Sequence, residues 1–129
     1  MAKPKRSIRG LIFIFVLLAF GSVTIYGADW SNTIVAVALD NNLYTIEKSG
    51  ALYRTDLTSG KWVQIGKSEF ANTRLLIAGN QNLLTIESDG SLYRVNPTNG
   101  AWVQLGKSGD WKGSLAAAFV NDRLYTVEA

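Results

Sequence analysis

One repeated stretch constrains the fold of this chain more than any other feature. A copy runs from Leu83 to Gly106 (LLTIESDGSLYRVNPTNGAWVQLG), and an earlier copy runs from Leu43 to Gly66 (LYTIEKSGALYRTDLTSGKWVQIG). The same text begins a third time at Leu124, as LYTVEA. The period is about 40 residues, which is long enough for four short strands. The repeat therefore predicts an all-β fold made from copies of one small sheet.

Each unit consists of short runs of strand-forming residues separated by turn residues. In the first unit we expect strands at Thr33–Leu39, Leu43–Glu47, Ala51–Thr55 and Trp62–Ile65. In the second we expect Thr73–Gly79, Leu83–Glu87, Ser91–Val95 and Trp102–Leu105, and in the third Ser114–Val120 and Leu124–Glu128. The first strand of each unit is almost wholly apolar, which predicts that it is buried on both faces.

The turn between the second and third strands predicts the strand register. Asp89-Gly90 is typical of a two-residue hairpin turn with positive φ at both residues. That turn would place Thr45 opposite Arg54 and would make Glu47 and Arg54 diagonal neighbours on one face. The recurring glutamates Glu47, Glu87 and Glu128 are then interpreted as structural partners of arginines.

The full pattern carries a family resemblance. It runs aromatic, Thr, apolar strand, L-Y-x-[IV]-E, turn Gly, L-Y-R, loop Gly, W-V-Q-[IL]-G. It resembles a tectonin-type β-propeller repeat, or a related bacterial repeat of the same build, from Asp29 to Ala129. The resemblance implies blades of four antiparallel strands and a binding platform, often for glycans or lipopolysaccharide.

The number of repeats raises a question of closure. The units are 29–68, 69–109 and 110–129, so the chain holds two full repeats and half of a third. A propeller closes with about 4 to 8 blades. We therefore expect either several chains to complete a ring, as a cyclic dimer or trimer joined head to tail, or the chain to be a fragment of a longer propeller. Both alternatives stay open.

The residues before the repeats predict export. Met1–Arg9 is basic, Leu11–Phe20 is an unbroken apolar run, and Gly21–Ala28 is small and weakly polar. This layout is typical of a secretory signal peptide, and an uncleaved signal anchor is the alternative. We therefore expect an N-terminal hydrophobic helix within residues 1–28, ahead of the repeats. Under either alternative we expect the repeats outside the cytoplasm, as a secreted, periplasmic or membrane-anchored domain.

Composition narrows the possible chemistry. The net charge is +3, but from Asp29 onward the sequence has nine Lys or Arg against ten Asp or Glu, so nothing indicates a nucleic-acid partner. The chain has no histidine and no cysteine, which excludes His/Cys zinc sites and catalysis by a histidine base. No pair of carboxylates stands out for glycoside hydrolysis. We expect a protein that is not an enzyme and has no cofactor or metal.

The connections between units hold the candidate site. Chain direction places them on one rim with the turns between second and third strands. An aromatic plate beside carboxylate and amide groups suits a sugar, which stacks its ring and hydrogen-bonds its hydroxyls. The predicted ligand-binding residues are Trp30, Phe70, Trp111, Asp29, Glu69, Asp110, Asn32 and Asn72. The alternative is that each aromatic caps its own blade.

Two further aromatic sets are interpreted as core. Trp62 and Trp102 open the fourth strand of each full unit, and repeated aromatics commonly fill the space between blades. The Leu-Tyr pairs are interpreted in the same way. The sequence thus predicts an exported, non-enzymatic binding module for a glycan or cell-envelope ligand. The alternative is a structural or protein-interaction module.

Overall fold

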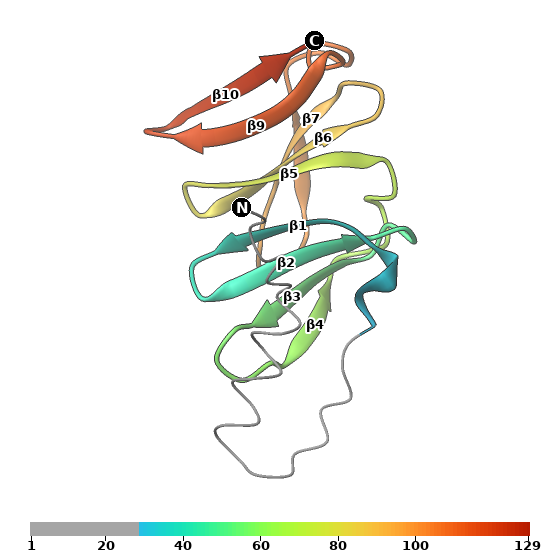
Figure 1. Ribbon diagram of the computed structural model, residues 1–129, viewed down its shortest axis with the longest axis vertical. Coiled ribbons are helices and arrows are strands. Elements are labelled where there is room, and N and C mark those ends of the chain that lie inside the picture. Colours follow the sequence, from blue (N-terminus) through green and yellow to red (C-terminus); the bar gives the residue numbers. More distant parts are fainter. Residues whose placement is uncertain (1–28) are drawn as a thin grey trace, which may run out of the picture. The chain divides into compact units, whose positions relative to one another are not determined.

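The computed structural model describes residues 29–129 of the chain. The predicted leader, with its hydrophobic helix and its cleavage, lies outside the described residues. Within them, a short 3-10 helix, η1 (Trp30–Asn32), leads directly into the first of ten β-strands. Figure 1 shows how these strands are arranged.

The strands form three antiparallel sheets, which we call blades 1 to 3. Blade 1 contains β1 (Thr33–Leu39), β2 (Asn42–Glu47), β3 (Leu52–Asp56) and β4 (Trp62–Ile65), in that order across the sheet. Blade 2 contains β5 (Thr73–Gly79), β6 (Asn82–Glu87), β7 (Leu92–Val95) and β8 (Trp102–Leu105), and blade 3 contains β9 (Ser114–Val120) and β10 (Arg123–Glu128). Every expected strand is present within one residue of its predicted bounds, which confirms the all-β fold of repeated sheets.

The tight two-residue turns lie at a different place from the one predicted. They join the first two strands of each blade. In blades 2 and 3 both turn residues have positive φ, which is 44° and 62° at Asn80 and Gln81 and 49° and 60° at Asn121 and Asp122, whereas in blade 1 Asp40 has φ of 52°. Positive φ at both residues matches the right-handed twist of the flanking strands. Asparagine and aspartate tolerate this conformation better than most residues, which explains their presence there.

The predicted turn at Asp89-Gly90 is wrong, because the loop there has three residues, Ser88 to Gly90. The amide of Gly90 donates to the carbonyl of Glu87 at 2.9 Å, and Gly90 adopts φ of 81°. A turn closed by one left-handed glycine is the usual form of a three-residue hairpin loop. The equivalent loop of blade 1 is closed by the same hydrogen bond, from Gly50 to Glu47 at 2.8 Å.

The longer loop shifts the register by one residue. Arg54 pairs with Tyr44, and Tyr53 pairs with Thr45, so Glu47 and Arg54 lie on opposite faces of blade 1. The predicted glutamate–arginine pairs are therefore wrong, although two of the glutamates do have structural partners. The Thr73 hydroxyl donates to Glu87 at 2.8 Å, and the Ser114 hydroxyl donates to Glu128 at 2.6 Å. Each contact ties the start of the first strand to the end of the second.

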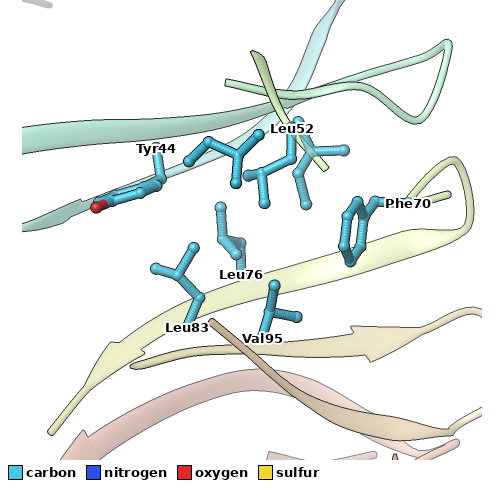
Figure 2. Close-up of a cluster of buried hydrophobic side chains, with 8 residues drawn as sticks. Tyr44, Leu52, Phe70, Leu76, Leu83 and Val95 are labelled. Atoms are coloured by element: carbon cyan, nitrogen blue, oxygen red, sulfur yellow. The ribbon is translucent and has the colours of Figure 1, made fainter. Parts of the chain in front are cut away.

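The blades pack face to face through their inner strands, with β5 beside both β1 and β9. We call the face of a blade that is directed toward the next blade its forward face, and the opposite side its rear face. Figure 2 shows the core between blades 1 and 2. Tyr44, Ile46, Leu52 and Ile65 come from the forward face of blade 1, and they meet Leu76, Leu83 and Val95 from the rear face of blade 2.

A second core lies between blades 2 and 3. The forward face of blade 2 contributes Ile77, Leu84, Ile86 and Leu92, and blade 3 contributes Ala117, Phe119 and Leu124. Among the first strands of the blades within residues 29–129, only β5 has a described blade against each face. The strands β1 and β9 alternate between half-buried and exposed residues along most of their length, so the prediction that every first strand is buried on both faces is wrong for these two.

Candidate binding groove

The predicted rim is confirmed by backbone hydrogen bonds that tie each connection to the blade before it. The amide of Phe70, in the connection from β4 to β5, donates to the carbonyl of Gly50 at 3.0 Å. The amide of Trp111, in the connection from β8 to β9, donates to the carbonyl of Gly90 at 3.1 Å. The inter-blade connections and the β2–β3 and β6–β7 turns therefore lie at the same end of the blades.

A groove of about 210 Å³ opens at this rim, where the connection from β4 to β5 meets the outer half of blade 2. Four sequence segments line it, namely the connection, the end of β6 with the following turn, β7 and β8. The lining residues are Glu69, Phe70, Asn72, Glu87, Ser88, Asp89, Tyr93 and Trp102. The groove thus brings together residues that are distant in the sequence, such as Trp102 and Glu69, which are 33 positions apart and share a hydrogen bond.

Trp102 forms the aromatic wall of the groove. Its ring packs edge-on against Tyr93, with ring centroids 5.1 Å apart and an interplanar angle of 81°. Its Nε1–H donates to Oε2 of Glu69 at 3.3 Å, across the groove. The side chain is nevertheless 50% exposed, so half of its surface is accessible to a ligand. A tryptophan fixed at its edge, with its ring open to solvent, is a preformed stacking surface.

The prediction that Trp62 and Trp102 fill the space between blades is wrong. Trp62 is 62% exposed and packs edge-on against Tyr53, as Trp102 does against Tyr93. Both tryptophans lie on the outermost strand of their sheet, and their exposed fractions of 62% and 50% show that neither is enclosed between two blades. Of the predicted core tyrosines, Tyr44 is buried, but Tyr125 on blade 3 is exposed.

The polar wall of the groove is acidic. Burial raises the pKa of Glu87, and the hydrogen bond from Thr73 only partly offsets that effect. Hydrogen bonds from the backbone and the hydroxyl of Ser91 lower the pKa of Asp89. With Glu69 and the amide of Asn72, the groove presents three carboxyl groups and one amide, and its lining includes no Lys or Arg. Such a surface accepts hydrogen bonds from hydroxyl or ammonium groups and repels anions.

Three of the eight predicted site residues line the groove, namely Glu69, Phe70 and Asn72. The ring of Phe70 is only 4% exposed and lies in the core between blades 1 and 2, the place that a blade-capping aromatic takes (Figure 2). The Phe70 ring is therefore not accessible as a stacking surface for a ligand.

The other predicted residues lie elsewhere. Trp111 is half-buried and packs against the second core. Asp110 Oδ2 accepts a hydrogen bond from the amide of Lys107 at 2.9 Å, and Asp29 Oδ1 accepts one from the amide of Ser31 at 3.0 Å. Trp30 is half-buried in η1, and the carbonyl of Asn32 accepts from the amide of Lys48 at 2.9 Å. The structure therefore does not bring these five residues into the groove.

Sequence reasoning missed five of the lining residues, which are Glu87, Ser88, Asp89, Tyr93 and Trp102. A signal for two of them was present. A tyrosine in the third strand is followed nine residues later by a tryptophan at the start of the fourth, in both complete units. Since β4 and β8 end their sheets, the tryptophan of each pair lies at the outer edge of its blade.

Among residues 29–129, no group of three or more His, Cys, Asp or Glu side chains lies close enough to hold a metal ion. Within the same range, no helix has the length and apolarity needed to cross a bilayer.

No protein-family model matches the sequence, and a search of curated proteins finds no match. Solved structures do match. A Saccharomyces cerevisiae complex of Dbp5 with Nup159 and Gle1 contains a chain with a TM-score of 0.55 and 16% identity over 75% of this chain. PorZ from Porphyromonas gingivalis matches 76% of this chain with a TM-score of 0.55 and 17% identity. BamB from Moraxella catarrhalis matches 74% of this chain with a TM-score of 0.51 and 19% identity.

The fold is that of a partial β-propeller. The three sheets and their connections match parts of β-propeller proteins, and the chain spans 25%, 14% and 29% of the three matched chains. At these identities the likeness concerns the fold alone. The affiliation with tectonins stays a prediction.

Proposed function

We propose that this partial β-propeller is a non-enzymatic binding module that takes a glycan with free hydroxyl or amino groups in the groove between the β4–β5 connection and the outer half of blade 2. The observation that carries the proposal is the position of Trp102. Its ring is half exposed, and its Nε1–H is held by Glu69 beside further carboxylate and amide acceptors. A sugar needs both an apolar plate for its ring face and acceptors for its hydroxyls.

The charge of the groove narrows the ligand class. Glu69, Glu87 and Asp89 line it without a basic side chain. Bringing a phosphate or a uronate next to these carboxylates would cost electrostatic free energy in a partly desolvated groove. The proposed ligand is therefore a neutral or amino-sugar glycan, and not the phosphorylated part of a lipopolysaccharide.

Export to the cell envelope is part of the proposal and rests on the basic and apolar sequence of residues 1–28. PorZ, which shares the fold, is a surface component of a bacterial secretion system. N-terminal sequencing of protein from the envelope fraction tests this part. A start near Ala28 or Asp29 would indicate a cleaved signal peptide, and an intact N-terminus would indicate an anchor. Recovery from the cytosol alone would contradict export.

The ligand is tested by a glycan array followed by calorimetric titration of the best neutral or amino-sugar hit. Changing Trp102 to Ala removes the stacking surface, and we expect affinity to fall by about tenfold, or about 1.4 kcal/mol. The matched control is Trp62→Ala, because Trp62 occupies the same repeat position, packs on Tyr53 in the same way and lies outside the groove. Equal effects of the two changes would contradict the assignment.

A second candidate follows from the same three carboxylates. A groove with an open indole and several acidic groups also suits a lysine or arginine side chain, through ion pairing and cation–π contact. In that case the module would dock a basic segment of a partner protein. A blank glycan array together with Trp102-dependent binding of a Lys/Arg-rich peptide would favour this candidate over the glycan.

A further inference from the structure

The groove beside Trp102 is more acidic than the equivalent surface of the first repeat unit. Alignment of the two complete units pairs each of the eight lining residues with one residue of unit 1, and at six positions the residue or its chemical class is the same. The other two positions are adjacent in the β6–β7 turn, where Ser88 and Asp89 take the places of Lys48 and Ser49. A positive charge is thus absent from the groove and a negative charge is added.

The fold of the turn does not require the charge of Asp89. Its Oδ1 accepts a hydrogen bond from the amide of Ser91 at 2.9 Å. In blade 1 the Ser49 hydroxyl accepts the equivalent bond from the amide of Ala51 at 3.3 Å, and the same backbone hydrogen bond closes both loops. A neutral serine therefore builds the same loop. The carboxylate of Asp89, whose pKa is lowered by its hydrogen bonds with Ser91, is available for another purpose.

Glu87 is the least available of the three carboxyl groups in the groove. It accepts a hydrogen bond from the Thr73 hydroxyl at 2.8 Å, and Glu128 accepts an equivalent one from Ser114 in blade 3, so this contact belongs to the structure of the repeat. Glu69 and Asp89 are both exposed, whereas Glu87 is half-buried. The charges that a ligand can reach are therefore those of Glu69 and Asp89.

The indole of Trp102 determines where the charged part of a ligand would lie. Its Nε1–H points outward in the plane of the ring and donates to Glu69 Oε2 at 3.3 Å, so this carboxylate lies beyond the edge of the ring and not over its face. A sugar stacked on the open face directs its equatorial substituents past that edge. A lysine ammonium centred over the ring for a cation–π contact would lie apart from the carboxylate. The geometry therefore favours a sugar ring with an amino substituent.

We infer that the groove selects a glycan whose sugar ring carries a free, protonated amino group, with the ring stacked on Trp102 and the ammonium held by Glu69 and Asp89. Asp89 is the specificity-determining residue, since unit 1 has a neutral serine at its position. Blade 2 has blade 1 on one side and blade 3 on the other, so the groove is not a surface left open at either end of the described residues. The inference rests on the proposed glycan function and narrows its ligand to cationic amino sugars.

Calorimetric titration of the full chain in detergent with three oligosaccharides of equal length and linkage tests the inference. They are built from glucosamine, N-acetylglucosamine and glucose, so they differ in one ring substituent, which is an ammonium, an acetamide or a hydroxyl group. Slightly below neutral pH, where the amine is protonated, we expect the glucosamine oligomer to bind about tenfold more tightly than the other two. The net charge of the chain, +3, repels a polycation, so the overall charge cannot produce this preference.

A matched pair of variants assigns the preference to Asp89. Asp89→Asn keeps an acceptor for the amide of Ser91 and removes the charge, and it should abolish the preference while leaving the affinity for the glucose oligomer unchanged. Asp56→Asn is the control, because Asp56 Oδ1 accepts from the amide of Thr58 at 3.0 Å in a turn outside the groove. Asn96 occupies that position in blade 2, so the fold tolerates the change. Thermal unfolding checks that both variants are folded.

Ionic strength provides a second measurement of the same preference. At about 1 M salt the Debye length falls to about 3 Å, which screens exposed charges. The preference for the glucosamine oligomer should therefore shrink in the unchanged chain and in Asp56→Asn. In Asp89→Asn, salt should alter the three affinities equally.

The outcomes distinguish this inference from the glycan proposal on which it rests. Equal binding of the three oligomers, weakened in each case by Trp102→Ala, would overturn selection for an amine and leave the glycan module in place. A preference retained in Asp89→Asn would overturn the role of Asp89. No binding of the glucosamine oligomer would overturn the inference whatever a glycan array shows, and Trp102-dependent binding of a Lys/Arg-rich peptide would then favour a protein partner.

Discussion

The two interfaces inside this propeller fragment are built from the same repeat yet are held together differently. Between blades 1 and 2 the contact is a broad apolar core that includes Tyr44 and Ile46, and Figure 2 shows this cluster. Between blades 2 and 3 the core is smaller, and polar contacts supplement it, including Arg74 and a 2.7 Å hydrogen bond from Asn80 to Asp122. The duplicated blades therefore differ at several of the positions that touch a neighbour, such as Ile34 and Arg74.

The largest effect is expected from the first core. Changing Ile46, which has no exposed surface, to Ala should lower the free energy of unfolding by about 2–5 kcal/mol, since it leaves a cavity. The matched change at the equivalent position of blade 3, Val127→Ala, should cost much less in a monomer, since that side chain is 60% exposed. Chemical denaturation of both variants at low protein concentration measures the difference. Equal losses would mean that the face of blade 3 is already covered.

The next effect concerns residue sizes at the two interfaces. Gly79 of blade 2 meets Phe119 of blade 3, and the repeat places Leu39 and Ala78 at the same two positions between blades 1 and 2. Gly79→Leu copies the residue of blade 1 into blade 2, where it would collide with Phe119, at a cost of about 1–3 kcal/mol. Adding Phe119→Ala recreates the Leu–Ala combination of the first interface and should recover part of that loss. A double-mutant cycle by thermal unfolding gives the coupling, and a purely additive result would show that the two positions do not meet.

A smaller effect is expected from the loss of the Arg74 hydrogen bonds that join blade 2 to blade 3. Arg74→Ile installs the residue of blade 1, keeps apolar contact and removes the hydrogen bonds to the carbonyls of Ser114 and Trp111. We expect a loss of about 1–2 kcal/mol, because the freed carbonyls are only partly buried. Hydrogen exchange should locate the loss in blade 3, with β1–β4 unchanged. A uniform loss of hydrogen-exchange protection over all blades would contradict a local role of Arg74 at blade 3.

The smallest effect is a difference in pH dependence between blades 2 and 3. Burial raises the pKa of Glu87, so the folded state binds its proton more tightly than the unfolded state. Stability should therefore fall as pH rises from the ordinary glutamate pKa to the raised value. Glu128 is the opposite case, since the hydrogen bond from Ser114 lowers its pKa, and its contribution is lost as pH falls through the lowered value.

Single variants separate these two contributions. Glu87→Gln should flatten the decline of stability above the ordinary glutamate pKa, while Glu128→Gln should flatten the decline at acid pH. Denaturant midpoints measured across that range are the readout. An unchanged profile for Glu87→Gln would show that the carboxyl group is more solvated than its position between Thr73 and the groove indicates.

The strands were predictable because period, turn residues and apolar runs all point to the same boundaries, and each strand was found within one residue. The register was not, because Asp89-Gly90 fits either a two-residue turn or the last two positions of a three-residue turn. The choice depends on the hydrogen bond from Gly90 to Glu87, which no local pattern specifies. The extra loop residue shifts the strand pairing by one position, so Glu47 and Arg54 lie on opposite faces of blade 1 and not on the same face.

The groove was predictable only in part. The connection residues Glu69 and Asn72 were identified because they follow a strand end, but the exposure of Trp102 was not. Whether a repeated tryptophan is core or surface depends on which strand forms the edge of the sheet, and that follows from packing between units. Phe70 shows the converse, since a loop aromatic folded back into the core.

The pair of Gly79 and Phe119 also bears on how three similar units find their order in the folding chain. Near-identical repeats are prone to swapping and to assembly in the wrong sequence. Blade 3 carries the bulky Phe119 on its rear face, and the forward position of blade 1 is occupied by Leu39, so the two faces would overpack if they met. Only blade 2 offers the space. Gly79, which has no side chain, thus determines that blade 3 packs on blade 2. It disfavours a misfolded arrangement in which blade 3 packs directly on blade 1.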